Sequence, residues 1–347
     1  MNHELFLFPF LRAFLVSSGL TLLFIFLADF FSLFPNKNQQ HHIHKKKISR
    51  FGGAAIIIAF VAAVFLDGNL IITHPLWGLI VSAFLILFFG ILDDFLNLDW
   101  KKQLFFQICA AILIFIFGVN IQHITGPFGK VIDFGDAQFS MASLFLGITW
   151  MVVMMNSMNW FDGIDGASAG VTFFGAIAII FVSLKPEVNQ PPMAIIASIL
   201  AGSILGFLIF NFYPSKIIAG TSGSIFMGFI LAVLAIFSGA KIATTLLVMT
   251  LPLADSIWVI WKRIRFRDSV FSPDNKHLHH CLLKMGWSQK KIALLFYTVT
   301  GIVVIIALNT RALGKMVAIL MVFALTLMMM FFIDAQMLKK EKYNVIK

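Results

Sequence analysis

The chain has 347 residues, and its composition is that of a membrane protein. Apolar residues make up 60% of it and charged residues only 12%, half the usual share of a globular domain. A soluble fold of this length cannot bury so much apolar surface. The formal net charge of +10 is explained by the Lys and Arg that cytoplasmic loops collect. Composition therefore excludes a secreted disulfide scaffold, a disordered chain and a nucleic-acid-binding domain.

Apolar runs separated by polar segments predict an all-α, polytopic membrane bundle, a single domain over 1–347. A spanning helix needs about 20 apolar residues. The first run is too long for a signal peptide and is taken as the first span. Gly, Pro and Asp residues in the loop 120–140 indicate turns and a short hairpin. The eleven predicted spans are 7–34, 52–66, 76–92, 103–119, 141–155, 167–184, 193–210, 224–239, 242–260, 292–308 and 314–334.

The distribution of Lys and Arg predicts how the chain is oriented in the membrane. With the N-terminus outside, the inside segments hold 20 Lys and Arg residues and the outside loops hold 5. This asymmetry favours an outside N-terminus and a cytoplasmic C-terminus. The same orientation places five polar clusters at span ends on one face. A transporter more often has its polar residues near the bilayer midplane, so the pattern favours an interfacial active site for one soluble and one lipid substrate.

Two of the five clusters combine glycine with cations or hydroxyl groups. Residues 41–53 contain three histidines, a run of lysines and a pair of glycines. They suit a basic membrane anchor or a phosphate-binding loop. Residues 211–224 contain an asparagine, a lysine and a Gly/Ser loop that opens the next span. This loop suits an anion site at a helix start, or a tight turn between spans.

Carboxylates and amides form the second and third clusters. Asp93 and Asp94 directly follow an apolar run, where ionised groups are costly. An adjacent pair suits metal coordination or proton abstraction better than a helix cap. The third cluster has a spacing of three, which lines its side chains along one helix stripe and suits Mg²⁺ better than a simple polar helix end. Its members are Asn156, Asn159, Asp162 and Asp165.

The fifth cluster is the longest inside segment, 261–291, which holds eight Lys and Arg residues and the sequence HLHH. Its positive charge suits an anionic headgroup or a nucleotide, or a solvated loop. The histidines have no nearby Cys or Glu and lack a typical zinc spacing. Contact with a phosphate or a nucleotide therefore explains them better than a metal site.

Taken together, these motifs resemble those of the polyprenyl-phosphate N-acetylhexosamine-1-phosphate transferases, a family of membrane enzymes. The resemblance covers about residues 44–283, in the family's order. The HxHH form favours the bacterial N-acetylglucosamine-type branch over the muramoyl-pentapeptide branch. The matching motifs are RFGG at 50–53, GILDD at 90–94, NSMNWFDGIDG at 156–166, NFYPSK at 211–216 and PDNKHLHH at 273–280.

The resemblance implies a multi-pass enzyme of the bacterial inner membrane with its active site facing the cytoplasm. In this family a lipid phosphate, usually undecaprenyl phosphate, attacks the β-phosphate of a UDP-N-acetylhexosamine. The products are a lipid-diphosphate-sugar and UMP, in the first membrane step of a cell-envelope polysaccharide. The reaction requires Mg²⁺, with Mn²⁺ as an alternative. The sugar, the polymer and the oligomeric state, a homodimer included, are not defined by the motifs.

The resemblance also implies roles for individual residues. Asp93 and Asp94 match the aspartate pair that is proposed to activate the lipid phosphate or to shape the metal site, and Asp162 is placed with them as catalytic. Asn159 matches a metal-contacting asparagine. The predicted substrate-binding residues are Asp165, which matches a uracil-recognising position, and Lys47, Asn156, Asn211, His277, His279 and His280.

Some positions depart from the family pattern. Thr221 stands where the family has a metal-binding aspartate, Ile218 replaces an aromatic residue, and Gln103 replaces a lysine. A threonine hydroxyl is a weaker Mg²⁺ ligand than a carboxylate. The departures therefore support a second hypothesis, a catalytically impaired relative that binds lipid or nucleotide. A third hypothesis, a transporter, depends on Asp255, an ionisable residue inside a predicted span beside Pro252.

Overall fold

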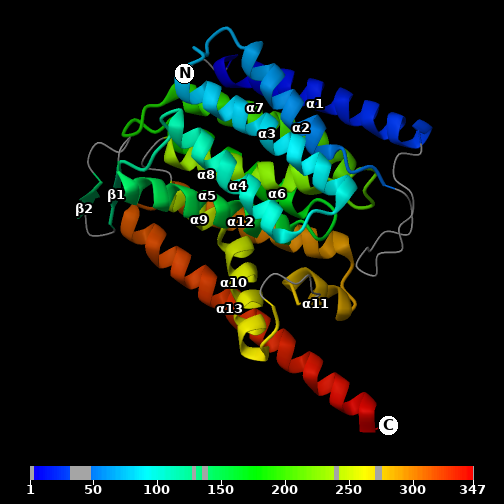
Figure 1. Ribbon diagram of the computed structural model, residues 1–347. Coiled ribbons are helices and arrows are strands. Elements are labelled where there is room, and N and C mark those ends of the chain that lie inside the picture. Colours follow the sequence, from blue (N-terminus) through cyan, green and yellow to red (C-terminus); the bar gives the residue numbers. More distant parts are fainter. Residues whose placement is uncertain are drawn as a thin grey trace.

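The computed structural model of the protein describes residues 4–31, 48–126, 130–134, 140–237, 242–269 and 276–346. Over these residues it is an all-α bundle with one small hairpin, as predicted (Figure 1). The elements are α1 (Glu4–Phe31), α2 (Gly52–Phe65), α3 (His74–Leu96), α4 (Trp100–Ile116), β1 (His123–Thr125), β2 (Val131–Asp133), α5 (Met141–Phe161), α6 (Ala167–Ser183), α7 (Pro191–Asn211), α8 (Gly220–Ile236), α9 (Ile242–Val248), α10 (Thr250–Phe266), α11 (Leu278–Lys284), α12 (Gln289–Asn309) and α13 (Ala312–Ile346).

Every predicted span overlaps a helix of the bundle. In the described residues six helices are long and apolar enough to cross a membrane, and the bent pair α9–α10 makes a seventh. Three more, α2, α6 and α8, are apolar but shorter. A multi-pass membrane protein is therefore confirmed, whereas the count of eleven spans and the sides of the two termini stay predictions.

Local sequence explains where several helices begin. Proline occupies the first turn of α3 and of α7, where its missing amide hydrogen has no helical partner to lose. Asp99 caps α4, because its Oδ1 accepts a hydrogen bond from the amide of Lys102 at 2.9 Å. Ser288 caps α12 in the same way through the amide of Lys291. These caps end the connecting loops at defined residues.

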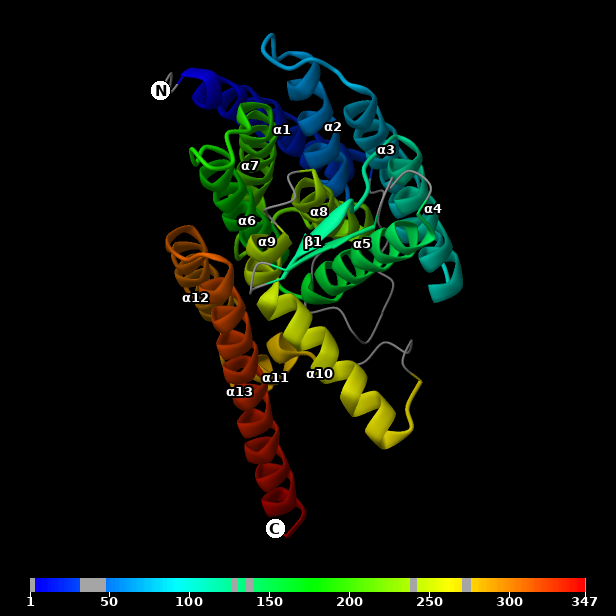
Figure 2. The same cartoon turned by 90° about the vertical axis from the view of Figure 1, so that its left-hand side faces the viewer.

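Helix α8 forms the centre of the bundle. It packs against α2, α3, α5, α6 and α9, and all its residues from Ser222 to Ile236 are buried. Figure 2 shows it surrounded by these helices. A helix that is apolar on every side is expected at such a position. The loop that precedes α8 is thereby held at a fixed place at one end of the bundle.

Small residues allow α1 and α7 to pack closely. A Cβ atom at Gly206 would lie 2.6 Å from the carbonyl oxygen of Phe14, and one at Gly202 would overlap the carbonyl of Phe10. The Ser17 hydroxyl donates to the carbonyl of Ser203 at 2.6 Å. Close approach over a small-xxx-small sequence is typical of helix pairs in membranes.

The predicted span 242–260 is bent in the structure. The chain breaks at Met249 between α9 and α10, which meet at an angle of 67°. Pro252 explains the break, because it has no amide hydrogen to donate to the carbonyl four residues earlier. Helix α10 then leaves the bundle beside α13 (Figure 2). Residues 242–260 therefore form two helical segments that meet at a bend.

The hairpin predicted in the loop 120–140 is confirmed. Strands β1 and β2 are antiparallel, with His123 opposite Asp133. In Figure 1 the hairpin lies at the left-hand end of the bundle and α11 at the right. The predicted site residues gather at the end that carries α11.

Candidate active site

The start of α2 is joined to the segment before α8 by backbone hydrogen bonds. Ser49 and Ile217 form a parallel bridge, and the amides of Gly52 and Gly53 donate to the carbonyls of Ile218 at 3.1 Å and Ala219 at 2.8 Å. A phosphate-binding role for these two glycine amides is therefore wrong, because both are already bonded to the backbone. The glycines instead bring α2 and the α8 loop into contact.

Asp93 and Asp94, at the end of α3, bind the start of α8. The Thr221 hydroxyl donates to Asp93 Oδ2 at 2.7 Å, and the Thr221 amide donates to Asp94 Oδ2 at 3.1 Å. The Arg50 guanidinium lies 3.8 Å from Asp94 Oδ1. The start of α8, which the sequence suggested as an anion site, is thus occupied by the Asp94 carboxylate. A helix N-terminus is a favourable place for negative charge. Both carboxylates are buried.

Gly220 is needed where the α8 loop meets these carboxylates. Its φ of +68° is one that glycine adopts without strain. A Cβ atom there would lie 2.5 Å from Asp94 Oδ2 and 2.5 Å from the carbonyl oxygen of Arg50. The loop can approach the aspartate pair only because this position has no side chain.

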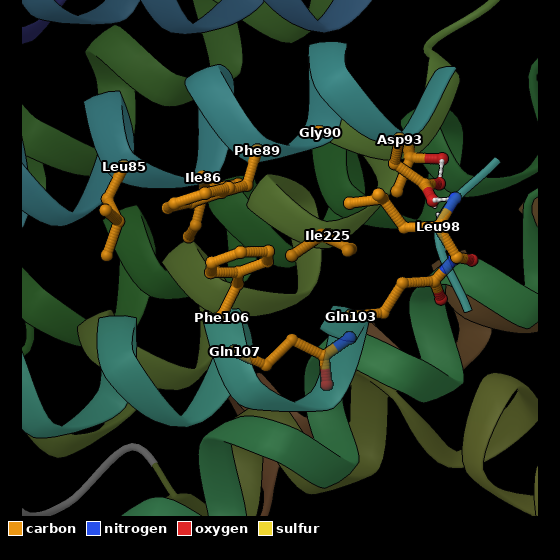
Figure 3. A pocket seen from close by; sticks show the side chains of 11 residues that line it. Leu85, Ile86, Phe89, Gly90, Asp93, Leu98, Gln103, Phe106, Gln107 and Ile225 are labelled. Carbon is orange, nitrogen blue, oxygen red and sulfur yellow. Dashed lines mark hydrogen bonds between the residues drawn. The ribbon is translucent and has the colours of Figure 1, made fainter. Parts of the chain in front are cut away.

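A pocket between α3, α4 and α8 ends at Asp93 (Figure 3). At this end Gln103 Nε2 donates to Asp93 Oδ1 at 2.9 Å, and the Leu98 amide donates to the same oxygen at 2.9 Å. The other end is apolar, and the stacked rings of Phe89 and Phe106 line it. Gln103, which stands where the family has a lysine, therefore gives Asp93 a neutral donor.

The third sequence cluster reaches the same region from α5. Asn159 Oδ1 accepts a hydrogen bond from the Ser224 hydroxyl of α8 at 2.7 Å. Asn156 instead pairs with Gln107 of α4, with its Nδ2 2.5 Å from Gln107 Oε1. Gln107 also lines the pocket that ends at Asp93. The stripe predicted from the spacing of three thus faces both α8 and α4.

Asp162 lies just past the end of α5 and accepts a hydrogen bond from the Ser168 hydroxyl. The pKa of the Asp162 carboxyl is raised to about 7, mainly by burial and in part by the negative charges of Asp165 and Asp94, against the Ser168 hydrogen bond that lowers it. Asp94, Asp162 and Asp165 are therefore close enough for their charges to interact.

Asp165 and Asn211 hold the loop that follows. Asp165 Oδ2 accepts from the Ser215 amide at 3.0 Å. Asn211 Oδ1 accepts from the Gly166 amide at 3.0 Å, and its Nδ2 donates to the carbonyl of Ile217 at 2.9 Å. Gly166 has a φ of +76°, which glycine adopts readily. The side-chain amide of Asn211 therefore joins two loops, in addition to the substrate contact that the resemblance implies.

The histidines lie against the loop of residues 162–166 that follows α5, here called the DG loop after Asp162 and Gly163. His277 Nδ1 lies 2.8 Å from Asp255 Oδ2, and the rings of His277 and His279 stack with centroids 5.7 Å apart. A side chain at Gly163 would overlap the His279 ring. Burial lowers the pKa of His279 well below its ordinary value, and the neighbouring His280 and His277 lower it further. The His279 ring is therefore neutral at pH 7.

The structure thus brings the predicted residues of four clusters to one end of the bundle. Lys47 lies outside the described residues. Two partners were missed by sequence reasoning, Gln107 and Gln289, of which the second accepts from the Asp165 amide at 3.2 Å. Each is a glutamine beside or within an apolar run, and that contrast is the signal that could have identified them.

The donor set was tested for its fit to Mg²⁺. Within the described part of the chain no three His, Cys, Asp or Glu side chains form a metal cluster. Mg²⁺ needs fewer protein ligands, because it retains waters and binds substrate phosphates alongside one or two carboxylates. Asp93, Asp94 and Asp162 supply carboxyl groups near one another, and Asn159 supplies an amide oxygen that bonds Ser224, three residues after Thr221. This set of oxygen ligands fits Mg²⁺ bound together with phosphates.

Comparison with known proteins decides the family. Residues 76–239 match the family model described as glycosyl transferase family 4. The chain is 32% identical over 302 residues to a decaprenyl-phosphate N-acetylglucosaminephosphotransferase of Mycobacterium leprae, covering 78% of this chain and 75% of the relative. This chain belongs to glycosyl transferase family 4. The family therefore includes an enzyme that is named as an N-acetylglucosaminephosphotransferase acting on decaprenyl phosphate.

Two other relatives show how far this glycosyl transferase family 4 likeness extends. A probable undecaprenyl-phosphate N-acetylglucosaminyl 1-phosphate transferase of Bacillus subtilis is 29% identical, over 87% of this chain and 84% of that one. A phospho-N-acetylmuramoyl-pentapeptide-transferase of Desulforudis audaxviator is also 29% identical, over 77% of this chain and 85% of that one. The resemblance stated from the motifs is confirmed.

Proposed function

We propose that this protein transfers N-acetylglucosamine-1-phosphate from UDP-N-acetylglucosamine to a polyprenyl phosphate, with undecaprenyl phosphate as the acceptor. The observation that carries the proposal is the contact of the Asp93–Asp94 pair with Thr221 beside the DG loop, in a chain of this family. The lipid-phosphate oxygen attacks the β-phosphorus of the donor, a new P–O bond forms, and the bond to UMP breaks. The products are polyprenyl-diphosphate-N-acetylglucosamine and UMP.

The side chains divide this reaction between them. Asp93 and Asp94, held by Thr221, would hold Mg²⁺ together with Asn159 and Asp162. When bound, Mg²⁺ supplies a positive charge that offsets the phosphate charges in the transition state. Asp165 recognises the uracil ring, and the histidines at the start of α11 contact the donor phosphates. Such positioning and electrostatic stabilisation account for most catalysis of phosphoryl transfer.

The pocket of Figure 3 marks the polar end of the proposed acceptor site, and in this structure it is too narrow to hold a polyprenyl chain. It has an apolar end beside Phe89 and Phe106 and a polar end at Asp93 and Gln103. An acceptor that joins a hydrocarbon chain to a phosphate has the same two-part chemistry. The location of the active site on the cytoplasmic side of a bacterial inner membrane rests on the asymmetry of Lys and Arg.

The second candidate function is a catalytically impaired relative, which Thr221 motivates. Thr221 nevertheless bonds both carboxylates, so this position retains its contact with the aspartate pair. An impaired protein would show no transfer as the wild type and would gain transfer in Thr221→Asp. Transfer by the wild type that is lost in Asp93→Asn would exclude this candidate.

The deciding experiment is an assay on membranes that contain the overexpressed protein. They are incubated with radiolabelled UDP-N-acetylglucosamine, undecaprenyl phosphate and Mg²⁺, and the label in the lipid extract is counted. We expect labelled lipid that depends on the protein and on the acceptor. Parallel incubations use UDP-N-acetylgalactosamine and UDP-N-acetylmuramoyl-pentapeptide as donors. Absence of labelled lipid with all of these donors would overturn the proposal.

A further inference from the structure

Asp255 has a place in the structure that the proposed function does not yet use. It lies on α10, just after the 67° break, and is completely buried. Both of its carboxylate oxygens are occupied. Oδ2 lies 2.8 Å from His277 Nδ1, and Oδ1 accepts the amide hydrogen of Leu278 at 2.7 Å. This side chain therefore fixes both the ring of the first motif histidine and the backbone beside it.

The chemistry of the carboxylate defines the state of the histidine ring. An ionised carboxylate only accepts hydrogen bonds, so the hydrogen between these groups is on His277 Nδ1. The bond made by one ring nitrogen determines what the other can do. Nε2 is left to meet a substrate, as an acceptor when the ring is neutral or as a donor when it is protonated. Both forms depend on the same contact with Asp255.

The contacts of His277 lead to the donor side of the active site. Its ring stacks on His279 and lies 6.2 Å, between centroids, from Trp160 at the end of α5. His279 in turn packs on Gly163 of the DG loop. Arg263, eight residues after Asp255 on α10, is buried, and its guanidinium lies 5.6 Å from the Trp160 ring centroid. Helix α10 thus directs Asp255 and Arg263 to one group of side chains around the DG loop.

We propose that Asp255 is a positioning residue of the transferase. It holds His277 with the hydrogen on Nδ1 and fixes the start of α11, so that the histidines lie against the DG loop in the geometry that binds the sugar nucleotide. The proposal rests on the proposed function. It also removes the argument for a transporter, which depended on Asp255 as an ionisable residue inside a predicted span. The Asp255 carboxylate contacts His277.

The first test reads the ring directly and needs no turnover. The purified full-length protein, labelled with ¹⁵N-histidine, is studied by solid-state NMR in lipid, and His277→Gln identifies the His277 signal. We expect Nδ1 of His277 to carry hydrogen in the wild type. In Asp255→Asn, the oxygen of the new side-chain amide can still accept from the Leu278 amide. Its NH₂ group then faces His277 Nδ1 and donates to it, so the ring hydrogen of His277 moves to Nε2. A wild-type ring with hydrogen on Nε2 alone would overturn the proposal.

The second test is a double-mutant cycle on the kinetics of transfer. Asp255→Asn should lower kcat/KM for UDP-N-acetylglucosamine by about 10- to 100-fold, the usual cost of losing a partner that orients a histidine. In a His277→Ala background it should cost almost nothing, because the ring that it orients is gone. Ser256→Ala is the matched control, since its buried hydroxyl bonds the Pro252 carbonyl and no histidine. An equal loss in both backgrounds would overturn the proposal.

The two tests separate this inference from the proposed function. If the protein transfers no sugar phosphate at all, the proposed function fails while the NMR result still decides the state of His277. If transfer is normal and Asp255→Asn lowers neither kcat/KM nor the Nδ1 signal, the inference fails and the proposed function stands. Circular dichroism and the melting temperature in detergent show whether each variant is folded.

Discussion

The Asp93–Asp94 pair and the single residue Asp255 are buried carboxylates that differ in how their negative charge is balanced. Among the described residues, Asp93 and Asp94 have neutral donors from Thr221, Gln103 and Leu98, with one cation, Arg50, at 3.8 Å. Asp255 faces one histidine and one backbone amide, each within 2.8 Å. The Asp93–Asp94 pair lies beside a pocket and near the carboxyl of Asp162. Asp255 is fully buried among side chains.

This difference separates a binding site from a positioning contact. Buried charges are costly unless they are paired or bind an ion. The Asp93–Asp94 pair has more negative charge than its protein partners offset, so it is suited to a cation and to the phosphates that come with it. Asp255 has its partners already and is suited to holding a neighbouring side chain in place. The following predictions test this contrast.

The largest effect is expected from the aspartate pair. Asp93→Asn or Asp94→Asn should reduce the rate of transfer about 100- to 1,000-fold, because each removes charge that acts on the transition state. The rate is measured with purified protein at saturating donor and acceptor. Asp99→Asn is the matched control, since Asp99 lies a few residues further along the chain, where it caps α4 and pairs with the exposed Lys102. A rate within twofold of the wild type in Asp94→Asn would contradict the charge-excess account.

Thr221 tests whether neutral donors suffice to hold the pair. Thr221→Val keeps the shape and removes the hydroxyl that donates to Asp93 at 2.7 Å, and a hydrogen bond to a charged group contributes about 1.5–3 kcal/mol. We expect turnover to fall about 10-fold. Thr221→Ser retains the hydroxyl and should stay close to the wild type. Equal activity of the valine and serine variants would show that the hydroxyl has no role.

Gly163→Ala tests the contact between the DG loop and the histidines. The added methyl group would overlap the His279 ring and should displace α11. We expect KM for the donor to rise about tenfold, roughly 1.4 kcal/mol of lost binding, with a smaller change in kcat. Gly147→Ala on α5 is the control, because nothing lies within 4 Å of its added Cβ. An unchanged KM in Gly163→Ala would separate the histidines from the donor site.

The smallest effect is expected away from both sets of carboxylates. Lys262 of α10 and Asp334 of α13 form a half-buried ion pair at 2.5 Å. Lys262→Met should lower the melting temperature in detergent by a few degrees and leave kcat unchanged. The exposed pair of Lys102 and Asp99, at 3.8 Å, offers a comparison, since surface pairs contribute about 0–1 kcal/mol. A large loss of activity in Lys262→Met would extend the site to α13.

The sequence predicted the helical architecture and most of the site because both depend on local patterns. Apolar runs mark the helices. Because successive spans alternate in direction, the order of the segments places Asp93, Asn159 and His277 on the same membrane face. The break at Met249 was not predicted, because a proline in an apolar run is tolerated in membrane helices and the run itself stays continuous.

The contacts between distant segments could not be predicted from the sequence either. Gly52 and Gly53 suited a phosphate-binding loop until the structure showed their amides bonded to Ile218 and Ala219. Asp255 was without a partner in the sequence because His277 lies 22 residues away. Such pairings depend on how helices pack, and no local spacing contains that information.

The central claim, that the Asp93–Asp94 pair binds a divalent cation and Asp255 does not, is tested most directly by Mn²⁺ binding. Electron paramagnetic resonance counts free Mn²⁺ during titration of the purified protein, with and without UDP-N-acetylglucosamine. The account predicts a protein-dependent site that Asp94→Asn weakens at least about tenfold, or 1.4 kcal/mol, and that Asp255→Asn leaves unchanged. Unweakened binding in Asp94→Asn, or loss of binding in Asp255→Asn alone, would contradict it.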